Sequence, residues 1–378
     1  MADQWMRLLT SWLDAGLIDE ATAARIRAFE QGRSGAARWR WPMWIALGFG
    51  ALMSGAGILL FVSSYWDAFS PAMRFTIVVA SVGLFHVAGA AMSNRAPALA
   101  TALHAIGTVA CGAGIFLTGQ IFNLAEHWPA GLLLWAGGAA IGWALLRDRP
   151  HLALLALLGP AWLSSEWVMA TEGNPHAAQQ VVTVGWFLLS IAYFTGVSRD
   201  RTEGSRGVLL WVGGIALLPA ALGLALAAAF SREVTGPTML PVSSGVRGLG
   251  WLFAVGGPSV LAVLLRRAGA WPNLVAAVWA VILVTLGDTI GGAALHAWWA
   301  VGAAAFVAWG VRDGRRERID MGSALFAAAV VSFYFSTVMT KLGRSASLIG
   351  LGVLFLAGGW ALERTRRELV RHTKGDQA

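Results

Sequence analysis

Polar side chains interrupt the apolar sequence at two places, near residues 65 and 120. Residues 63–71 read SSYWDAFSP, and residues 117–128 read LTGQIFNLAEHW. Carboxylates in such turns would attract a cation or a cationic group, amides would orient a ligand by hydrogen bonds, and a tryptophan would form an apolar wall. The sequence therefore predicts a binding pocket that contains Tyr65, Trp66, Asp67, Gln120, Asn123 and Glu126. The alternative is that these turns are polar only because they meet water.

The segment after residue 119 has a pattern that favours a pocket over a wet loop. Gln120 and Asn123 alternate with Ile121, Phe122 and Leu124. Such alternation is typical of a half-buried or re-entrant segment, whose polar groups need partners in protein or in a water-filled cavity.

Two histidines, His86 and His104, stand inside apolar segments. Counted from the turn near Asn94, one lies about eight residues back and the other about ten residues forward, which at about 1.5 Å per residue gives similar depths on antiparallel helices. One interpretation is a hydrogen-bonded pair, or histidines that bond to Ser or Thr. The other is a pair of metal or haem ligands, because neutral imidazole is the commonest metal ligand.

Catalytic and cofactor signatures are missing from the sequence. It contains no nucleophile elbow, no zinc-binding His-Glu helix motif and no phosphate-binding loop. Cys111 is the only cysteine, which excludes an internal disulfide and a cysteine metal cluster. We therefore assign no catalytic residue, no cofactor and, apart from the two histidines, no metal ligand.

The composition indicates that these groups belong to a protein embedded in a membrane. The 378 residues are 57% hydrophobic and 13% charged, whereas soluble domains carry about 25% charged residues. Apolar runs of about 17 or more residues recur along the chain, more than a soluble core can use. The net charge of +8 does not indicate nucleic-acid binding, because the basic residues occupy short turns between apolar runs. The sequence thus predicts an all-α polytopic transmembrane bundle in a lipid bilayer.

The apolar runs predict about twelve membrane-spanning helices, with about ten as the lower limit because several runs are short. Six prolines stand at or just before predicted helix starts, where the backbone N–H that proline lacks would have no partner within the helix. Three others fall inside predicted spans, where they predict kinks. The first group is Pro42, Pro71, Pro97, Pro129, Pro150 and Pro272; the second is Pro160, Pro219 and Pro258. The predicted spans are 42–64, 71–92, 97–118, 129–146, 150–168, 179–197, 207–230, 247–265, 271–286, 293–311, 320–338 and 345–362.

Lys and Arg residues orient the chain, because cytoplasmic loops are enriched in them. With the N-terminus in the cytoplasm, 23 of the 28 basic residues fall on the inner side and 5 on the outer side. Arg accounts for 26 of the 28, which together with abundant Ala suggests a bacterial gene. We therefore predict a bacterial inner-membrane protein with both termini in the cytoplasm, both polar turns on the outer face, and anionic lipid headgroups at the basic inner loops.

Residues 1–40 precede the first predicted span and read as two short helices, at 3–15 and 19–32. Gly16 is predicted to end the first helix, and Asp19 is predicted to cap the second. This hairpin either lies on the membrane surface or binds a cytoplasmic protein.

An internal repeat is suggested by matches at an offset of 165 residues, which bring the Arg-Asp sequence at 147–148 onto the Arg-Asp sequence at 312–313. With three gap residues allowed, Gln120 meets Asp288. Parallel halves of this kind are common in transporters, whose substrate sites lie where the halves meet. Asp288 therefore joins the predicted pocket. The predicted domains are a cytoplasmic hairpin, two transmembrane halves of six helices and a basic cytoplasmic tail, at 1–40, 41–198, 207–362 and 363–378.

Three stretches together resemble the domain of unknown function 2157 family of bacterial membrane proteins. They are WLDAGLIDEATAARI, then LGFGALMSGAGILLFVSSYWDAF, then FLTGQIFNL leading into LLLWAGGAAIGWALL. The resemblance covers roughly residues 1–150 and implies an inner-membrane protein with an N-terminal cytoplasmic segment, but no activity. The family has Asn where this chain has Tyr65 and Tyr where it has Phe122, so the matching residues are Trp66, Asp67, Gly119 and Gln120.

These features predict transport or translocation of a small or lipid-like substrate through an outward-facing polar pocket. A non-catalytic scaffold or envelope-assembly factor that acts through residues 1–40 is the second hypothesis, and a membrane-embedded enzyme is the third. A transporter requires a cavity between the halves that reaches toward mid-membrane, and a scaffold requires an exposed apolar patch, for example on the hairpin. An enzyme requires a carboxylate within hydrogen-bond reach of an imidazole, such as Glu126 or Asp67 with His127 or His296.

A single cysteine at position 125 tests the predicted orientation. In a Cys111→Ala background, Ala125→Cys should react with a membrane-impermeant thiol reagent added outside the cell, because this turn is predicted to face outward. The Cys111→Ala protein without the new cysteine is the control. Labelling only from the cytoplasmic side would reverse the predicted topology.

Overall fold

The structure is a computed structural model of the full chain. It describes residues 9–28, 68–122, 127–196, 205–229, 241–287, 292–334, 349–350, 352–353, 356 and 360. These residues are almost entirely helical and include no strand, which confirms the predicted all-α bundle. The chain divides into two compact units, Met1–Ile77 and Val78–Ala378.

The first unit contains a helical hairpin, of which residues 9–28 are described. Residues 9–14 and 20–28 are helical, and Gly16 adopts φ 68° between them, in the left-handed region that glycine tolerates. Asp19 accepts a hydrogen bond of 3.1 Å from the backbone N–H of Thr22. Hydrogen bonds from the Thr22 side chain and backbone hold the pKa of Asp19 below its usual value. The predicted helix stop and helix cap are both confirmed.

Helices account for nearly all of the described chain from Pro71 onward, and the first of them, Pro71–Met92, begins in the first unit and continues into the second. Their bounds are α3 (Pro71–Met92), α4 (Pro97–Ile121), α5 (Pro129–Leu146), α6 (Arg149–Ala170), α7 (Pro175–Thr195), α8 (Ser205–Ala229), α9 (Ser244–Trp251), α10 (Gly257–Arg266), α11 (Trp271–Gly287), α12 (Gly292–Arg312) and α13 (Arg316–Phe333). A π-helical turn, η2 (Leu252–Gly256), joins α9 to α10, and a 3-10 turn, η3 (Arg267–Ala270), joins α10 to α11.

Prolines and short polar side chains set several helix starts. Proline occupies one of the first two positions of α4, α5, α6 and α7. Asp148 caps α6 and Asn174 caps α7 by accepting backbone N–H bonds. The asparagine cap explains why α7 begins before the predicted residue 179. The predicted spans 71–92 and 129–146 have the observed bounds, whereas the first and twelfth predicted spans lie largely outside the described residues.

The predicted span at 247–265 differs from a regular helix. Pro258 lacks an N–H, and its ring would collide with the carbonyl four residues earlier in an α-helix. The chain accommodates Pro258 by widening the preceding turn into η2, so a π turn takes the place of the predicted kink.

Eight helical stretches among the described residues are long and apolar enough to cross a membrane. One of them, Ser244–Thr285, has 42 residues and includes α9, α10 and most of α11. About 20 residues suffice for one crossing, so this stretch has the length of two. The chain is therefore a multi-span membrane protein, and the number twelve stays a prediction.

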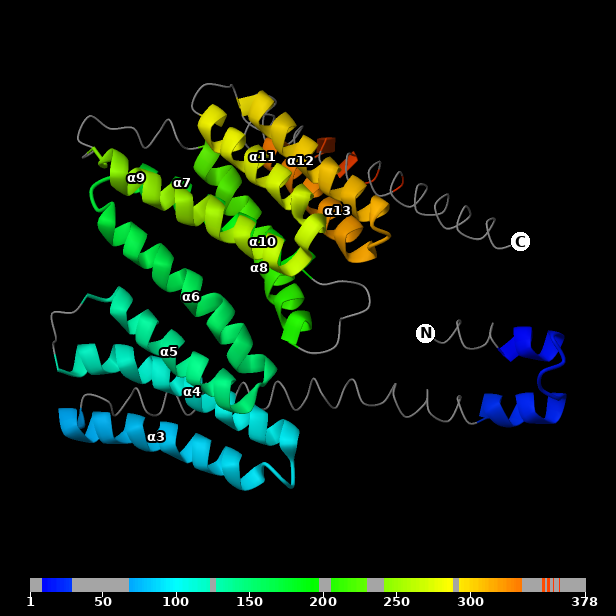
Figure 1. The fold of residues 1–378 in the computed structure, drawn as a ribbon, viewed down its shortest axis with the longest axis horizontal. Helices are drawn as coiled ribbons and strands as arrows, with labels where there is room; N and C mark the ends of the chain where they lie inside the picture. Colours follow the sequence, from blue (N-terminus) through cyan, green and yellow to red (C-terminus); the bar gives the residue numbers. More distant parts are fainter. Residues whose placement is uncertain are drawn as a thin grey trace. The chain divides into compact units, whose positions relative to one another are not determined.

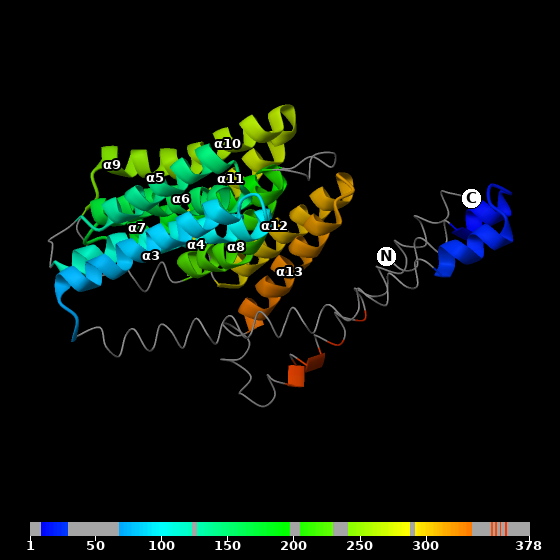
Figure 2. The same cartoon turned by 90° about the horizontal axis from the view of Figure 1, so that it is seen from below.

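The helices of the second unit pack around α7 and α8. The main core joins apolar side chains of α7, α8, α11, α12 and α13. Both views show α12 and α13 as neighbours and show α9 continuing into α10 as one rod (Figures 1 and 2). Helix α10 packs on α7, while α6 contacts α5, α7 and α8.

A partly buried charge cluster surrounds Asp313, in the turn between α12 and α13. The Oδ2 atom of Asp313 accepts hydrogen bonds from Trp309 at 2.9 Å, from Arg266 at 3.5 Å and from Arg318. Arg266 and Arg318 each donate a second bond of 3.3 Å to the carbonyl oxygen of Thr195, at the end of α7. Both guanidinium groups lie 4.9 Å from the centre of the Trp309 ring. Through these two arginines the cluster connects α7, α10, α12 and α13.

The charges of this cluster determine the ionisation of Asp313. Burial opposes the charged carboxylate, but the bonds and positive charge of Arg318 outweigh it, so the pKa of Asp313 lies below its usual value. Burial also lowers the pKa of Arg318, to about 10. The ionised carboxylate of Asp313 therefore stabilises the fold above the ordinary aspartate pKa, and this contribution is lost as the pH falls through the lower folded-state pKa of Asp313.

Substitution of Asp313 tests the importance of this cluster. Asp313→Asn should lower the free energy of unfolding by about 3 kcal/mol, because it leaves a nearly buried arginine without its counter-charge. Thermal unfolding of the purified protein in detergent measures the effect as a lower Tm. Glu172→Gln, at an exposed position, should change stability by less than about 0.5 kcal/mol. Equal stabilities for the two variants would contradict the proposed importance of the cluster.

Candidate functional site

The predicted outer pocket falls mostly outside the described residues. Tyr65, Trp66, Asp67, Asn123, Glu126 and Asp288 all lie there, so their proximity stays a prediction. Gln120 is described, and its side chain is exposed at the last turn of α4. Of the segment 117–128, the structure describes 117–122 and the final His127 and Trp128.

His127 connects this segment to the far end of α6. Its Nε2 atom lies 2.8 Å from the Oε2 atom of Glu166, whose other oxygen accepts a bond of 3.0 Å from Trp162. Trp128 adds a bond of 3.2 Å to the sulfur of Met169. An imidazole therefore does meet a carboxylate here, but the carboxylate is Glu166, which the sequence analysis did not pair with it.

His296, the other imidazole considered for such a pair, has different surroundings. Its Nε2 atom lies 3.2 Å from the hydroxyl of Ser332, and its ring lies edge-on to Phe333 with centres 5.5 Å apart. Both neighbours belong to α13, so this histidine joins α12 to α13.

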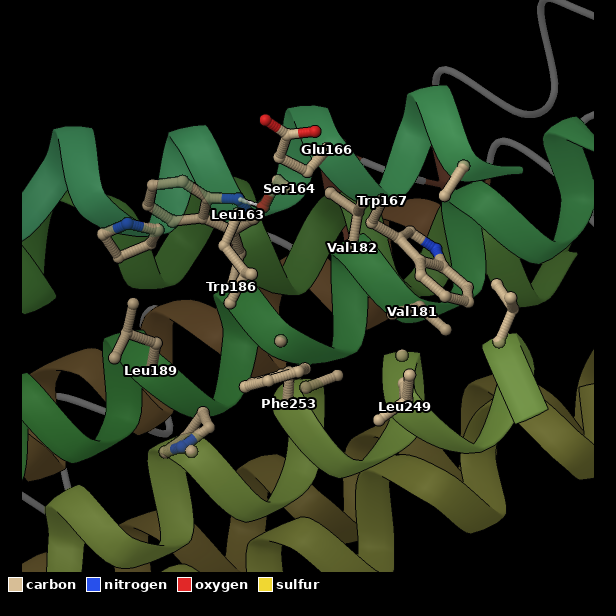
Figure 3. A pocket seen from close by; sticks show the side chains of 18 residues that line it. Leu163, Ser164, Glu166, Trp167, Val181, Val182, Trp186, Leu189, Leu249 and Phe253 are labelled. Atoms are coloured by element: carbon tan, nitrogen blue, oxygen red, sulfur yellow. Dashed lines mark hydrogen bonds between the residues drawn. The ribbon is translucent and has the colours of Figure 1, made fainter. Parts of the chain in front are cut away.

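An apolar groove of about 450 Å³ runs between α6, α7 and the α9–α10 rod. Leu163, Trp186, Leu189, Leu249 and Phe253 form much of its walls (Figure 3). The polar atoms inside it satisfy each other, because Trp186 donates a hydrogen bond of 3.0 Å to Ser164. Glu166 borders the groove, but its carboxylate points away from Leu249 and Phe253 (Figure 3). This space is therefore an apolar groove with a charged residue at its border.

Glycines bring the walls of the groove into contact at its edges. A Cβ atom added at Gly250 would lie 2.4 Å from the ring of Trp167, and one added at Gly185 would lie 3.4 Å from the backbone of Ala254. These close contacts join α9 to α6 and α7 to η2. Both glycines also line the groove.

The histidine pair of α3 and α4 is present as a hydrogen bond. The Nδ1 atoms of His86 and His104 lie 3.1 Å apart. Each ring also lies over a glycine of the opposite helix, because a Cβ added at Gly89 or at Gly107 would lie 2.9 Å from the facing imidazole. The similar depth expected from the sequence is confirmed. The His-x-x-Gly spacing that both helices share is a sequence signal for this contact.

His151 is fully buried and was not singled out from the sequence. Its Nδ1 atom lies 2.7 and 2.8 Å from the two oxygens of Asp148, and its Nε2 atom lies 2.8 Å from the hydroxyl of Thr108. The ring lies over Gly142 of α5, where an added Cβ would be 2.2 Å away. The Asp-x-x-His spacing at the start of α6 is the signal that could have found it, because it places the histidine over its own helix cap.

These imidazoles are occupied in hydrogen bonds, and no metal site is complete among the residues that the structure describes. Among the described residues, no group of three or more His, Cys, Asp or Glu side chains could hold a metal ion. His86, His104, Thr108 and Cys111 instead share the wall of a cavity of about 260 Å³. The histidines are thus polar groups that satisfy each other between apolar helices.

Comparison with known proteins identifies a family for the part of the chain that contains His86, His104 and His151. Residues 10–153 match the DUF2157 family, described as "Predicted membrane protein". The resemblance suggested by the sequence is confirmed over this region. No curated protein and no solved structure matches the chain. The DUF2157 region includes α3, α4, α5, the histidine pair, Asp148 and His151, and it ends before the residues of α6 that line the groove.

A glycine substitution in the DUF2157 region tests the packing of its imidazoles. Gly142→Ala should lower the free energy of unfolding by about 2 kcal/mol, because the new methyl group displaces His151 from Asp148 and Thr108. Gly138→Ala is the matched control on the same helix, since a Cβ there meets nothing within 4 Å. The control should be neutral or raise stability by up to about 1 kcal/mol.

The same substitution in a second background identifies the cause. In a His151→Ala background, Gly142→Ala should no longer destabilise the protein, because the ring that it strikes is gone. A penalty that persists without the imidazole would mean that another contact of Gly142 is responsible. Thermal unfolding of the four variants completes this double-mutant cycle.

Proposed function

We propose that the protein binds a lipid-like amphiphile in the groove between α6, α7 and the α9–α10 rod and moves it within the membrane. The observation that supports this proposal most directly is the groove itself, about 450 Å³ with almost entirely apolar walls. Such a space is unfavourable for water and for a hydrophilic solute, but it suits an acyl chain or a flat apolar ring.

The location of the groove also supports transport. Helices α6 and α7 belong to the first predicted half and α9–α10 to the second, so the groove lies between the two parts of the chain that a parallel repeat would place together. It extends from Ala170, at the end of α6, to Pro160 near the middle of that helix. A transporter requires a cavity of this kind.

The helices that form the groove contain local breaks that permit bending. Pro160 interrupts the hydrogen bonding of α6, and the π turn before Pro258 interrupts the α9–α10 rod. Kinks and π turns are frequent hinge sites. We propose that the rod and α6 separate at these points to admit the substrate from the bilayer.

The predicted outer pocket fits this proposal as a headgroup site. Trp66, Asp67 and Gln120 match the family pattern, while Tyr65, Asn123, Glu126 and Asp288 complete the predicted set. An amphiphile with a cationic group would use Asp67 and Glu126 as counter-charges. We propose that its apolar part occupies the groove during movement.

A second candidate function rests on the hairpin of the first unit. Leu17 is 72% exposed and Trp12 is 41% exposed, and both are apolar. An exposed apolar patch is what a protein-docking scaffold requires. We therefore keep partner binding by residues 1–40 as the alternative to transport.

Lipid movement between leaflets tests the first proposal. Vesicles that contain the full-length protein should move a fluorescent phospholipid between leaflets faster than protein-free vesicles. Leu163→Trp fills the groove and should reduce the rate of lipid movement about tenfold. A tenfold change corresponds to about 1.4 kcal/mol, which is a typical free-energy cost of overpacking. Leu157→Trp is the matched control, because it is on the same helix, is 39% rather than 37% exposed, and does not line the groove.

A photoreactive lipid in the same vesicles separates binding from movement. Crosslinks to Leu163 or Phe253 without any lipid movement would refute transport and favour a scaffold. Neither crosslinks nor movement would refute the groove as a lipid site. Equal rates for Leu163→Trp and Leu157→Trp would exclude the groove from the transport path.

A further inference from the structure

A second apolar cavity, of about 430 Å³, opens between α11 and α12. Val275, Trp279 and Phe306 line its interior, and one end is formed by Trp271 together with Arg312. Trp271, Val275 and Val301 are each more than half exposed, so the cavity opens on the surface of the bundle. Its occupant in a bilayer must therefore be apolar over most of its length.

The charged end of the cavity has a specific geometry. The Cζ atom of Arg312 lies 4.7 Å from the centre of the Trp271 ring, and its Nε and Nη2 atoms each lie 3.3 Å from Oδ1 of Asp313. The side chain is nevertheless 51% exposed. Among the described residues, its Nη1 atom has no hydrogen-bond partner. Arg312 is thus fixed in position with donors still directed to the surface.

The surroundings of Arg312 carry excess positive charge. The two turns at 266–271 and 312–320 contain six arginines and three carboxylates, a net charge of +3. Asp313 is already bound by Arg266 and Arg318, and Glu317 pairs with Arg315. The exposed Arg267 and Arg316 add to the field at the cavity end. A ligand with a net negative charge would compensate this excess, whereas a zwitterionic ligand would not.

We propose that this cavity binds one anionic phospholipid per chain, with an acyl chain between α11 and α12 and its phosphate on Arg312. The combination of an apolar cavity with a basic end matches the two parts of such a lipid, and a guanidinium forms strong charge-assisted bonds to phosphate oxygens. The inference does not depend on what occupies the groove between α6, α7 and α10.

Native mass spectrometry of the full-length, delipidated protein tests this site. We expect one phosphatidylglycerol to bind with higher affinity than phosphatidylcholine of the same chain length. Arg312→Gln should reduce the affinity for phosphatidylglycerol about tenfold, the loss typical of one hydrogen bond to a charged group, and should leave phosphatidylcholine unchanged. Arg95→Gln is the matched control, because it removes an exposed arginine in the α3–α4 turn that does not line this cavity.

Two further measurements keep the proposal falsifiable if Arg312→Gln disturbs the fold. Ala305→Phe fills the cavity while Arg312 stays in place, and it should weaken binding of both lipids. Arg312→Lys retains the charge and should restore part of the preference for phosphatidylglycerol. Inorganic phosphate and glycerol phosphate should not displace the bound lipid, because they lack the acyl chain.

Three results would overturn the assignment. Equal losses for Arg312→Gln and Arg95→Gln would show that surface charge alone attracts the lipid. Equal affinity for the two lipids would remove the role of the headgroup charge. Displacement by inorganic phosphate at a comparable concentration would identify a free-anion site instead of a lipid site.

Discussion

The carboxylate of Asp313 is the contact on which the arrangement of the second unit depends most. Arg266, Arg318 and Trp309 reach one of its oxygens, and the two arginines also bond to the carbonyl at the end of α7. Without a counter-charge, a guanidinium as buried as that of Arg318 would be strongly unfavourable in an apolar bundle. The cluster therefore fixes where α10 ends relative to α7.

The imidazoles of the DUF2157 region meet the same constraint in another way. A polar ring between apolar helices must find a partner, and the helices must approach closely enough to supply one. Glycine at Gly89, Gly107 and Gly142 provides that approach by removing the side chain that each ring would strike. Histidine and glycine thus act as a complementary pair across these helix contacts. This accounts for their shared spacing without requiring a metal or a reaction.

The sequence was informative where the signal is local. Helix bounds such as those of α3 and α5 follow from a proline at the start and from hydropathy alone, and the turn at Gly16 follows from the conformational freedom of glycine. The depth of His86 and His104 could also be predicted, because one short turn joins their helices. Each of these inferences needs only residues within about one helix length of each other.

Features that join distant residues were not predictable in the same way. Asp313 meets Arg266 across 47 positions and Thr108 meets His151 across 43; both pairings depend on which helices pack together, and hydropathy does not encode this. The groove likewise lies between α6, α7 and the α9–α10 rod, so no single segment shows it. The enzyme hypothesis paired His127 or His296 with Glu126 or Asp67, which lie outside the described residues; the contact that His127 makes with Glu166 depends on how α6 packs and was not predicted.

The π turn has a consequence for the register of the groove wall. Along the α9–α10 rod the lining residues recur at every fourth position, as Val246, Gly250, Ala254 and Pro258 and as Leu249, Phe253 and Gly257. On an unbroken α-helix, a four-residue repeat drifts around the axis by about 40° each time, so the row would wind away from α6 and α7. The wider turn of η2 removes much of that drift and keeps the row facing one side. A helical wheel drawn for 244–266 with a uniform period would therefore assign some of these residues to the wrong face.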